Sequence, residues 1–554
     1  MEKIFRLSLL VLLMCTINCF AQPGAVKKAS KAEFILTTYK ADGSILATCK
    51  GIFVSQDGIA ISPWAPFVGA QRAVVTTADN KTLDVKSIIG ANELYDVAQF
   101  KVDGQTSKVK VSNEPVPENA KLWLQNNVDG KTSFEEVNVL RQEVFMEKYK
   151  FLVLSTNSDQ NIEGCPLYDN KGNVIALLQK NGHEANAVSA QFVADIKTTA
   201  LAFNNSVLAQ TSIAIALPVD LKEATLALLL SSQQNDTIKY KNTINQFISM
   251  FPNIPDGYQA MAQYEMNTNN FADADINMAK VLEVSDKKDE AHFSYGKLIY
   301  QKMLYKSDYN YPAWTLDKAM NEIKKAYSIN PLPIYKQVEG QIYYTQAKYQ
   351  DAYDIFMGLT KTNIRNADLF YEAAQSKQQL KADDKEILAL LDSAISVCKK
   401  PYSPESATYF FARASQYANM GLYRKAVQDF NQYDTLCYGR HNADFYYIRE
   451  QSEVKGKLFK QALDDINRAI ILAPQEPLYY AEKANLQLKV NQQYECIATA
   501  MTCINIAPEY PDIYLILGLA QIQTGQKKEG LQSLDKAKKL GNTQAQQFID
   551  RYKK

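Results

Sequence analysis

The chain has 554 residues, of which 61 are Lys or Arg and 60 are Asp or Glu, so its net charge is +1. A balance this even excludes a basic field that would hold nucleic acid or an anionic membrane. The apolar content of 46% is ordinary for globular proteins and argues against disorder of the whole chain. The length predicts several domains, although a repeat array can take most of it as one unit.

Residues 1–21 are typical of a secretory signal peptide, with two basic residues, an apolar run over 9–14 and a cleavage site after Ala21. The run is too short to span a bilayer, and no later segment is long enough. A lipoprotein is the alternative, but neither Cys15 nor Cys19 follows a small residue. We therefore expect a soluble mature chain that is exported to a bacterial periplasm or beyond.

The region 32–203 is rich in short β-type runs separated by turn signals such as Asp57-Gly58 and Asp129-Gly130. Many short strands at this spacing predict a barrel or a sandwich. The expected strands are 33–39, 51–54, 72–77, 85–90, 97–102, 121–124, 151–155 and 174–179.

Three segments of this region carry sharper motifs. The first, 51–70, reads Gly, an apolar strand, Ser-Gln-Asp-Gly, Ile-Ser and later Gly-Ala; the second is Tyr-Asp-Val-Ala-Gln-Phe-Lys at 95–101. The third is Ile-Glu-Gly-Cys-Pro-Leu-Tyr-Asp at 162–169. In this order and spacing they resemble trypsin-like proteases of the periplasmic heat-shock type, whose segments carry the triad His, the triad Asp and the nucleophile. The resemblance implies an all-β double barrel over 32–203.

The triad positions implied by the resemblance are Ala65, Asp96 and Glu163, so only the aspartate keeps its residue type. The family's mechanism needs a serine that a histidine activates, with the aspartate orienting that histidine. Ala65 has no base, and a carboxylate at Glu163 repels a developing oxyanion. Asn161 and Cys165 also add side chains where the family's oxyanion loop has glycines. We therefore expect a pseudo-protease with no catalytic residues.

No other residue of the sequence is expected to rescue catalysis. The chain has three histidines, and the one in this region, His183, is predicted to lie in a surface turn. The resemblance makes the segments of Cys49 and Cys165 neighbours, which implies a disulfide that closes the would-be catalytic loop. No CxxC motif or His/Cys cluster is present, so neither a metal site nor a cofactor is predicted.

The region 443–542 contains three copies of a 34-residue pattern, which start at Ala443, Pro477 and Pro511. Each has a large residue at slot 4 and small residues at slots such as 20 and 27, which predicts two closely packed helices per copy. The copies resemble tetratricopeptide units, which stack into an all-α solenoid. Stepping the pattern back predicts about nine units over 221–542, a linker at 204–220 and a capping helix at 543–554.

An inter-helix insertion near 306–315 interrupts the third unit and is interpreted as a flap packed on the solenoid, or else as a binding element. Tetratricopeptide arrays bind peptides or protein surfaces in their groove, so the resemblance implies protein or peptide partners. The groove slots hold Tyr, Glu, Gln and Ala more than cations, which disfavours the specialised arrays that bind chaperone-type C-termini.

Three functions follow from these patterns. The preferred one is an exported, non-catalytic interaction scaffold in which an inactive trypsin-like barrel is fused to a tetratricopeptide array. The first alternative is a serine-type endopeptidase with an unusual active site. The second is a component of an envelope glycan-handling assembly, for which no residue specifically argues. The sequence does not decide the oligomeric state.

Overall fold

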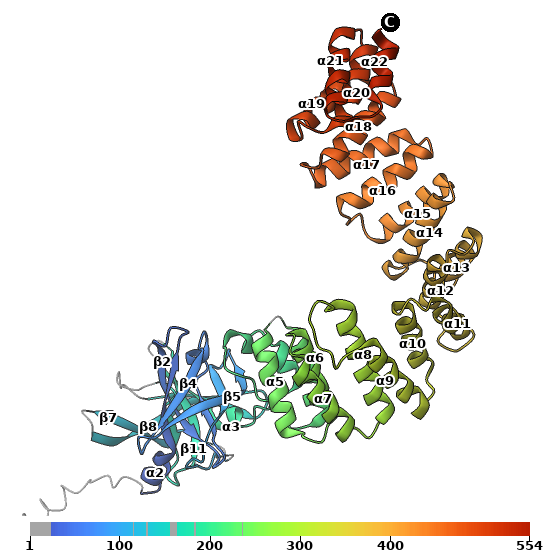
Figure 1. Ribbon diagram of the computed structural model, residues 1–554. Helices are drawn as coiled ribbons and strands as arrows, with labels where there is room; N and C mark the ends of the chain where they lie inside the picture. The colour runs from blue at the N-terminus through green and yellow to red at the C-terminus, as the bar shows by residue number, and fades with distance from the viewer. Residues whose placement is uncertain are drawn as a thin grey trace, which may run out of the picture. The chain divides into compact units, whose positions relative to one another are not determined.

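The computed structural model describes residues 24–112, 114, 116–128, 131–155, 163–181, 184–234 and 236–553. These residues form two compact units, one ending at Asp286 and the other beginning at Lys287 (Figure 1). The predicted signal peptide, the Asp129-Gly130 turn, Asn161 and His183 lie outside the described residues.

The first unit opens with two closed β-barrels of six strands each. The first barrel is ordered β1-β2-β3-β6-β5-β4 and the second β7-β8-β9-β12-β11-β10, so the two have the same strand order. This duplicated barrel confirms the trypsin-like double-barrel fold. The strands are β1 Glu33–Tyr39, β2 Ile45–Phe53, β3 Ile59–Ser62, β4 Arg72–Thr77, β5 Thr82–Asn92, β6 Val97–Val102, β7 Lys121–Val128, β8 Lys131–Phe145, β9 Tyr149–Leu154, β10 Pro166–Tyr168, β11 Val174–Asn181 and β12 Glu184–Ser189.

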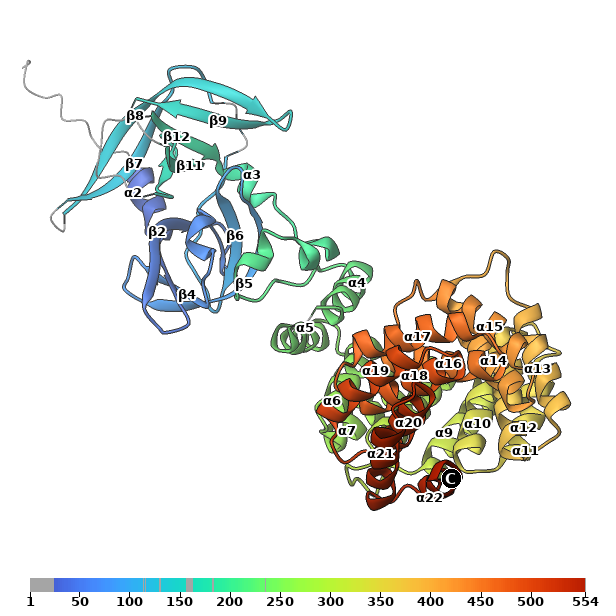
Figure 2. The ribbon, with the colours of Figure 1, turned by 90° about the horizontal axis from the view of Figure 1, so that it is seen from above.

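Alternation of apolar and polar residues directs one face of each strand into a barrel. Along β1, for example, Phe34 and Leu36 are buried while Ile35 between them is 36% exposed. The longest strand, β8, continues beyond the barrel wall as part of a long hairpin with β9 (Figure 2). Short helices accompany the strands: α2 Gly24–Ala29, η1 Ser30–Ala32, η2 Ala65–Phe67, α3 Ala190–Ala194, η3 Ala200–Asn204 and η4 Leu208–Gln210.

The segment 204–220 packs on the first barrel along much of its length. Ser212 donates its backbone N–H to the carbonyl of Ala70, and Ile88 of β5 exchanges backbone hydrogen bonds with Ala214 and Ala216. The side chain of Ile213 is buried in the barrel core. We call the stretch 211–217 the strap, because it adds to the edge of β5 and then leads into the helices.

Helices occupy the chain from Leu221 onward and confirm the all-α solenoid. Short turns join them in successive pairs, and α16, α18 and α20 begin where the 34-residue pattern places the starts of its copies. The helices are α4 Leu221–Ser232, α5 Thr237–Met250, α6 Pro255–Asn267, α7 Phe271–Val284, α8 Lys288–Tyr305, α9 Leu316–Ile329, α10 Pro333–Thr345, α11 Tyr349–Leu359, α12 Ala367–Gln379, α13 Asp384–Ser396, α14 Ala407–Asn419, α15 Tyr423–Leu436, α16 Ala443–Lys455, α17 Phe459–Leu472, α18 Pro477–Lys489, α19 Gln493–Ile506, α20 Pro511–Gln523, α21 Lys527–Lys539 and α22 Ala545–Lys553.

Small residues let paired helices approach each other. A Cβ atom on Gly518 of α20 would lie 2.8 Å from the carbonyl oxygen of Gly530 in α21. Cys496 and Cys503 take slots 20 and 27 of the second copy, where the pattern predicts small residues, and both are fully buried in α19. The insertion between α8 and α9 buries Trp314 to 2% exposure, as the flap interpretation requires. Among the described residues, no helix is long and apolar enough to cross a membrane.

Candidate functional site

The turn between β5 and β6 places Asp96 beside the position that the resemblance gives to the triad histidine. Its carboxylate oxygen Oδ1 accepts the backbone N–H groups of Trp64, at 3.0 Å, and of Ala65, at 2.7 Å. Asp96 has φ = +43°, in the left-handed region that aspartate tolerates better than most residues. The structure thus brings Ala65 and Asp96 together, with main-chain amides as the partners of the carboxylate.

The loop before β10 places Glu163 near the same point. The carbonyl oxygen of Glu163 accepts the backbone N–H of Lys50 in β2 at 2.9 Å. Gly164 has φ = +80° and donates its N–H to Leu178 of β11 at 2.9 Å. A Cβ atom at residue 164 would lie 2.2 Å from the carbonyl oxygen of Lys50, so only glycine fits here. The loop is therefore clamped between the two barrels.

Cys49 lies close enough to two of the predicted triad positions, Asp96 and Glu163, for the charges of both carboxylates to act on its thiol. Cys49 is 1% exposed, and burial raises its pKa strongly, with further increases from the charges of Glu163 and Asp96. A thiol in this setting stays protonated, whereas nucleophilic attack requires the thiolate. The nearby hydroxyl of Ser62 is fully buried and donates to the carbonyl of Pro63 at 3.0 Å.

The predicted disulfide between Cys49 and Cys165 is wrong, because the structure has both as free thiols. Successive residues of a strand point to opposite faces. The ammonium group of Lys50, next to Cys49 in β2, lies 3.7 Å from the sulfur of Cys165. Cys49 therefore faces away from Cys165, and its side chain packs in the core of the first barrel while Cys165 packs in that of the second.

A buried polar cluster that the sequence did not indicate lies where the two barrels meet. Lys50 Nζ donates to the carbonyl of Gln125 at 2.8 Å and lies 3.6 Å from a carboxylate oxygen of Glu33. The hydroxyl of Tyr168 donates to the other oxygen of Glu33 at 2.8 Å. Burial raises the pKa of Glu33 to about 7, although the charge of Lys50 lowers it, and burial raises that of Cys165 to about 12. The cluster connects β1 and β2 of the first barrel with β7 and β10 of the second.

An aromatic cluster, also missed at the sequence level, pins the Asp96 turn to the second barrel. The ring of Tyr95 lies 4.3 Å from that of Phe145 and 5.5 Å from that of Phe192, measured between centroids. Tyr149 completes the cluster and donates its hydroxyl to Asp195 at 2.8 Å. The side chain of Gln179 donates to the carbonyl of Tyr95. The turn is therefore fixed on both sides.

The two histidines that the structure describes lie in the second unit, His292 in α8 and His441 in the loop between α15 and α16. His292 contacts Glu322 at 2.6 Å, and His441 lies 3.1 Å from Asp434. No imidazole therefore lies in the described part of the barrels. Nor do the described residues contain a group of three or more His, Cys, Asp or Glu side chains placed to hold a metal ion.

Comparisons with known proteins give a limited result. No protein-family model matches the chain, and no curated protein matches it. Two solved structures of the HtrA-type protease AlgW with a tripeptide, one of them of a variant, are similar at 16% identity and a TM-score of 0.27. Each match covers 31% of this chain and 60% of the protease chain. The likeness carries no argument about activity, and the strand order of the barrels remains the basis for the fold.

Proposed function

We propose that this protein is an exported, non-catalytic interaction scaffold, in which an inactive trypsin-like double barrel is joined to a tetratricopeptide array that binds protein or peptide partners. The observation that carries the proposal is the set of groups around Asp96. Its carboxylate accepts the backbone N–H groups of Trp64 and Ala65. The charges of Asp96 and Glu163 both act on the thiol of Cys49.

Acyl transfer in this fold requires a nucleophile, a base within hydrogen-bond reach and donors for the oxyanion. Ala65 supplies no base, and Glu163 puts negative charge where the oxyanion would form. The buried thiol of Cys49 has a raised pKa and stays protonated. These three features support a barrel that has kept its fold without the chemistry.

The tetratricopeptide assignment of the array rests on spacing and packing. Gly296, Gly340 and Gly518 each lie on the first helix of a pair, where a Cβ atom would come within 3.0 Å of the second helix. Units of this kind expose the inner faces of their first helices, and such concave surfaces suit extended partners.

The test uses the mature protein, residues 22–554, and a serine-directed fluorophosphonate probe, with casein turnover as a second assay. We expect neither labelling nor turnover above buffer, while trypsin in parallel gives both. Labelling or turnover that the Asp96→Ala variant loses would overturn the proposal and favour a serine-type endopeptidase.

A further inference from the structure

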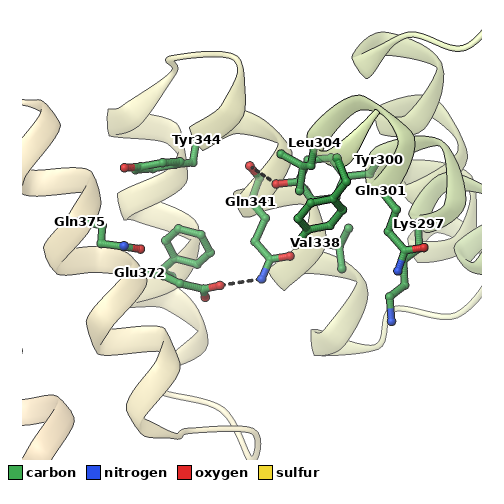
Figure 3. Close-up of a pocket in the computed structure, with 11 residues that line it drawn as sticks. Lys297, Tyr300, Gln301, Leu304, Val338, Gln341, Tyr344, Glu372 and Gln375 are labelled. Atoms are coloured by element: carbon green, nitrogen blue, oxygen red, sulfur yellow. Dashed lines mark hydrogen bonds between the residues drawn. The ribbon is translucent and has the colours of Figure 1, made fainter. Parts of the chain in front are cut away.

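The second unit contains a cavity of about 380 Å³ that is lined by side chains of α8, α10 and α12 and by Phe356 of α11 (Figure 3). This volume lies in the range of ordinary ligand sites. The walls are formed by side chains from three first helices of successive pairs, which no single pair could supply.

Residues at equivalent positions of successive first helices line this cavity because of the repeat geometry. Gly296 of α8 and Gly340 of α10 face their own second helices, because a Cβ atom on either would lie within 3.0 Å of an α9 or α11 side chain. Each next residue is rotated by about 100° around the helix. Lys297 and Gln341 are those next residues, and Gln375 has the same place in α12 as Gln341 has in α10. One position of the repeat therefore lines the cavity three times.

The amide groups of the cavity keep unused hydrogen-bonding capacity. Gln341 donates one N–H to Glu372 at 2.6 Å, which leaves its carbonyl oxygen facing the cavity. The side-chain amides of Gln301 in α8 and Gln375 in α12 make no hydrogen bond with any described residue, although both line the cavity. A primary amide offers a donor and an acceptor side by side, which is the pattern that a peptide group requires.

The charged groups favour a ligand that is neutral or acidic. The carboxylate of Glu372 already accepts hydrogen bonds from Gln337 and Gln341, and burial raises its pKa. Lys297 is exposed at the edge and has no ion-pair partner among the described residues. The cavity therefore has an exposed ammonium group at its edge, whereas its carboxylate is already engaged by two amides.

We propose that this cavity binds an extended peptide segment through its main chain, with an acidic side chain of the ligand beside Lys297. The inference rests on the proposed function and gives the array's partner a site and a chemistry. Neighbouring helices are about 8–10 Å apart, and an extended chain rises about 3.3 Å per residue, so amides on successive helices meet about every third peptide group.

The amides of the cavity also distinguish a peptide from a glycan, which binds by stacking its sugar rings on bare aromatic faces. Of the four aromatic rings that line the cavity, Tyr300 is 9% exposed, with its hydroxyl 2.9 Å from Thr345, and Phe356 is 1% exposed. Tyr344 is half-buried, and Tyr305 is 80% exposed. Tyr305 is therefore the one fully bare ring among these residues, whereas the amides of Gln301 and Gln375 are both open to a peptide group.

The experiment selects a ligand from a phage-displayed library of random dodecapeptides on the full mature protein. The selected peptide is then synthesised with a fluorescent label, and its Kd is measured by anisotropy. We expect the double variant Gln301→Ala/Gln375→Ala to weaken binding about tenfold or more, since each lost hydrogen bond contributes about 1 kcal/mol. The matched control is Gln532→Ala, which removes an exposed amide from α21 and should leave Kd unchanged.

Two further measurements sharpen the test. N-methylation of the peptide's backbone should weaken binding to the unmodified protein, and much less to the double variant. Lys297→Gln should remove the preference for acidic peptides. Because the side chains of Gln301 and Gln375 make no hydrogen bonds within the described protein, the double variant should keep the melting temperature of the unmodified protein.

The outcomes separate the two proposals. Peptide binding that the double variant retains in full would overturn this site and leave the scaffold function standing. Failure to capture any peptide would overturn both the site and the peptide-binding array. Cleavage of the selected peptide would overturn the non-catalytic function alone.

Discussion

Gly164 is the residue on which the geometry of the loop before β10 depends. Its left-handed φ and its closeness to the carbonyl of Lys50 and the ring of Pro63 both exclude a side chain. The neighbouring Glu163, Cys165 and β10 take their positions from this turn. The loop therefore constrains its backbone at this point, whichever side chains its neighbours carry.

A matched pair of substitutions tests this role. Gly164→Ala should destabilise the double barrel by about 3 kcal/mol or more, because backbone strain and a steric clash add up. Gly43→Ala has the same φ of +80° but nothing within 4 Å of its Cβ atom, so it should cost about 1 kcal/mol. Urea unfolding followed by tryptophan fluorescence measures both, and equal losses would contradict the argument.

The sequence identified the residues of the cleft better than their partners. Ala65, Asp96 and Glu163 could be placed because each lies in a contiguous motif. The pairing of Cys49 with Cys165 was wrong because a motif gives the strand but not the face on which a cysteine lies. The contacts of Glu33 with Lys50 and Tyr168 join three separate strands, and no local pattern reports such contacts.

At the scale of elements, α16 carries two acids, Glu450 and Glu453, that lie close together in the sequence and are almost fully buried. Glu450 is 0% exposed and Glu453 is 2% exposed, and each has a carboxylate oxygen without a hydrogen-bond partner. Burial raises the pKa of Glu450 to about 7, with a further increase from Glu482. Burial also raises the pKa of Glu453 to about 8, with a further increase from Asp465.

These pKa values make the stability of the second unit depend on pH. The folded state binds more protons than the unfolded state between about pH 4.5 and pH 8, so stability should fall as the pH rises through that window. The variant Glu450→Gln/Glu453→Gln should be more stable than the unmodified protein at pH 8, by several kcal/mol, and should gain little at pH 5.

Urea unfolding of the full chain, followed by circular dichroism at both pH values, measures this difference. Glu495→Gln, at an exposed position of α19, serves as the control and should change neither value. An equal gain for the double variant at pH 5 and pH 8 would refute the link to protonation.

The strap is a second element whose importance was not apparent from its composition. The segment 204–220 has no periodicity and was predicted to be a linker, yet Ile213 is only 6% exposed. Ile213→Ala should destabilise the first unit by about 3 kcal/mol, as is usual for a buried aliphatic side chain. Val219→Ala, at 89% exposure, should have no measurable effect. Similar melting temperatures for the two variants would show that the strap does not support the barrel.

Strand β8 is not among the strands expected from the sequence, and its charged residues explain why. It carries charged residues on its exposed face, and Glu136 pairs with Lys121 of β7 at 2.7 Å. Cross-strand ion pairs stabilise a sheet but interrupt the apolar alternation that marks a strand. The helices of the array were easier to predict, because their small residues recur at a fixed spacing along the chain.

At the scale of the whole molecule, the first compact unit combines the double barrel with α4–α7. Ala200, Phe203 and Leu217 share one apolar core with residues of α4, α5 and α6. Lys239 of α5 also donates to the carbonyl of Thr211 in the strap at 2.9 Å. The barrel and the first helices therefore depend on each other for burial.

Truncations test this dependence. A fragment of residues 24–286 should fold cooperatively, whereas a fragment of residues 24–220 should melt several degrees lower and bind the dye ANS, because it exposes the shared core. Calorimetry and dye fluorescence give the two readouts. If both fragments melt at the same temperature without dye binding, the predicted boundary at 204–220 is an independent domain border after all.

The strap also has a mechanical consequence for anything that the first helices hold. A flexible linker would let a bound partner adopt many orientations relative to the barrel. Here the hydrogen-bonded strap and the shared apolar core fix α4–α7 against the barrel, so a partner bound to these helices would be held in one orientation relative to it.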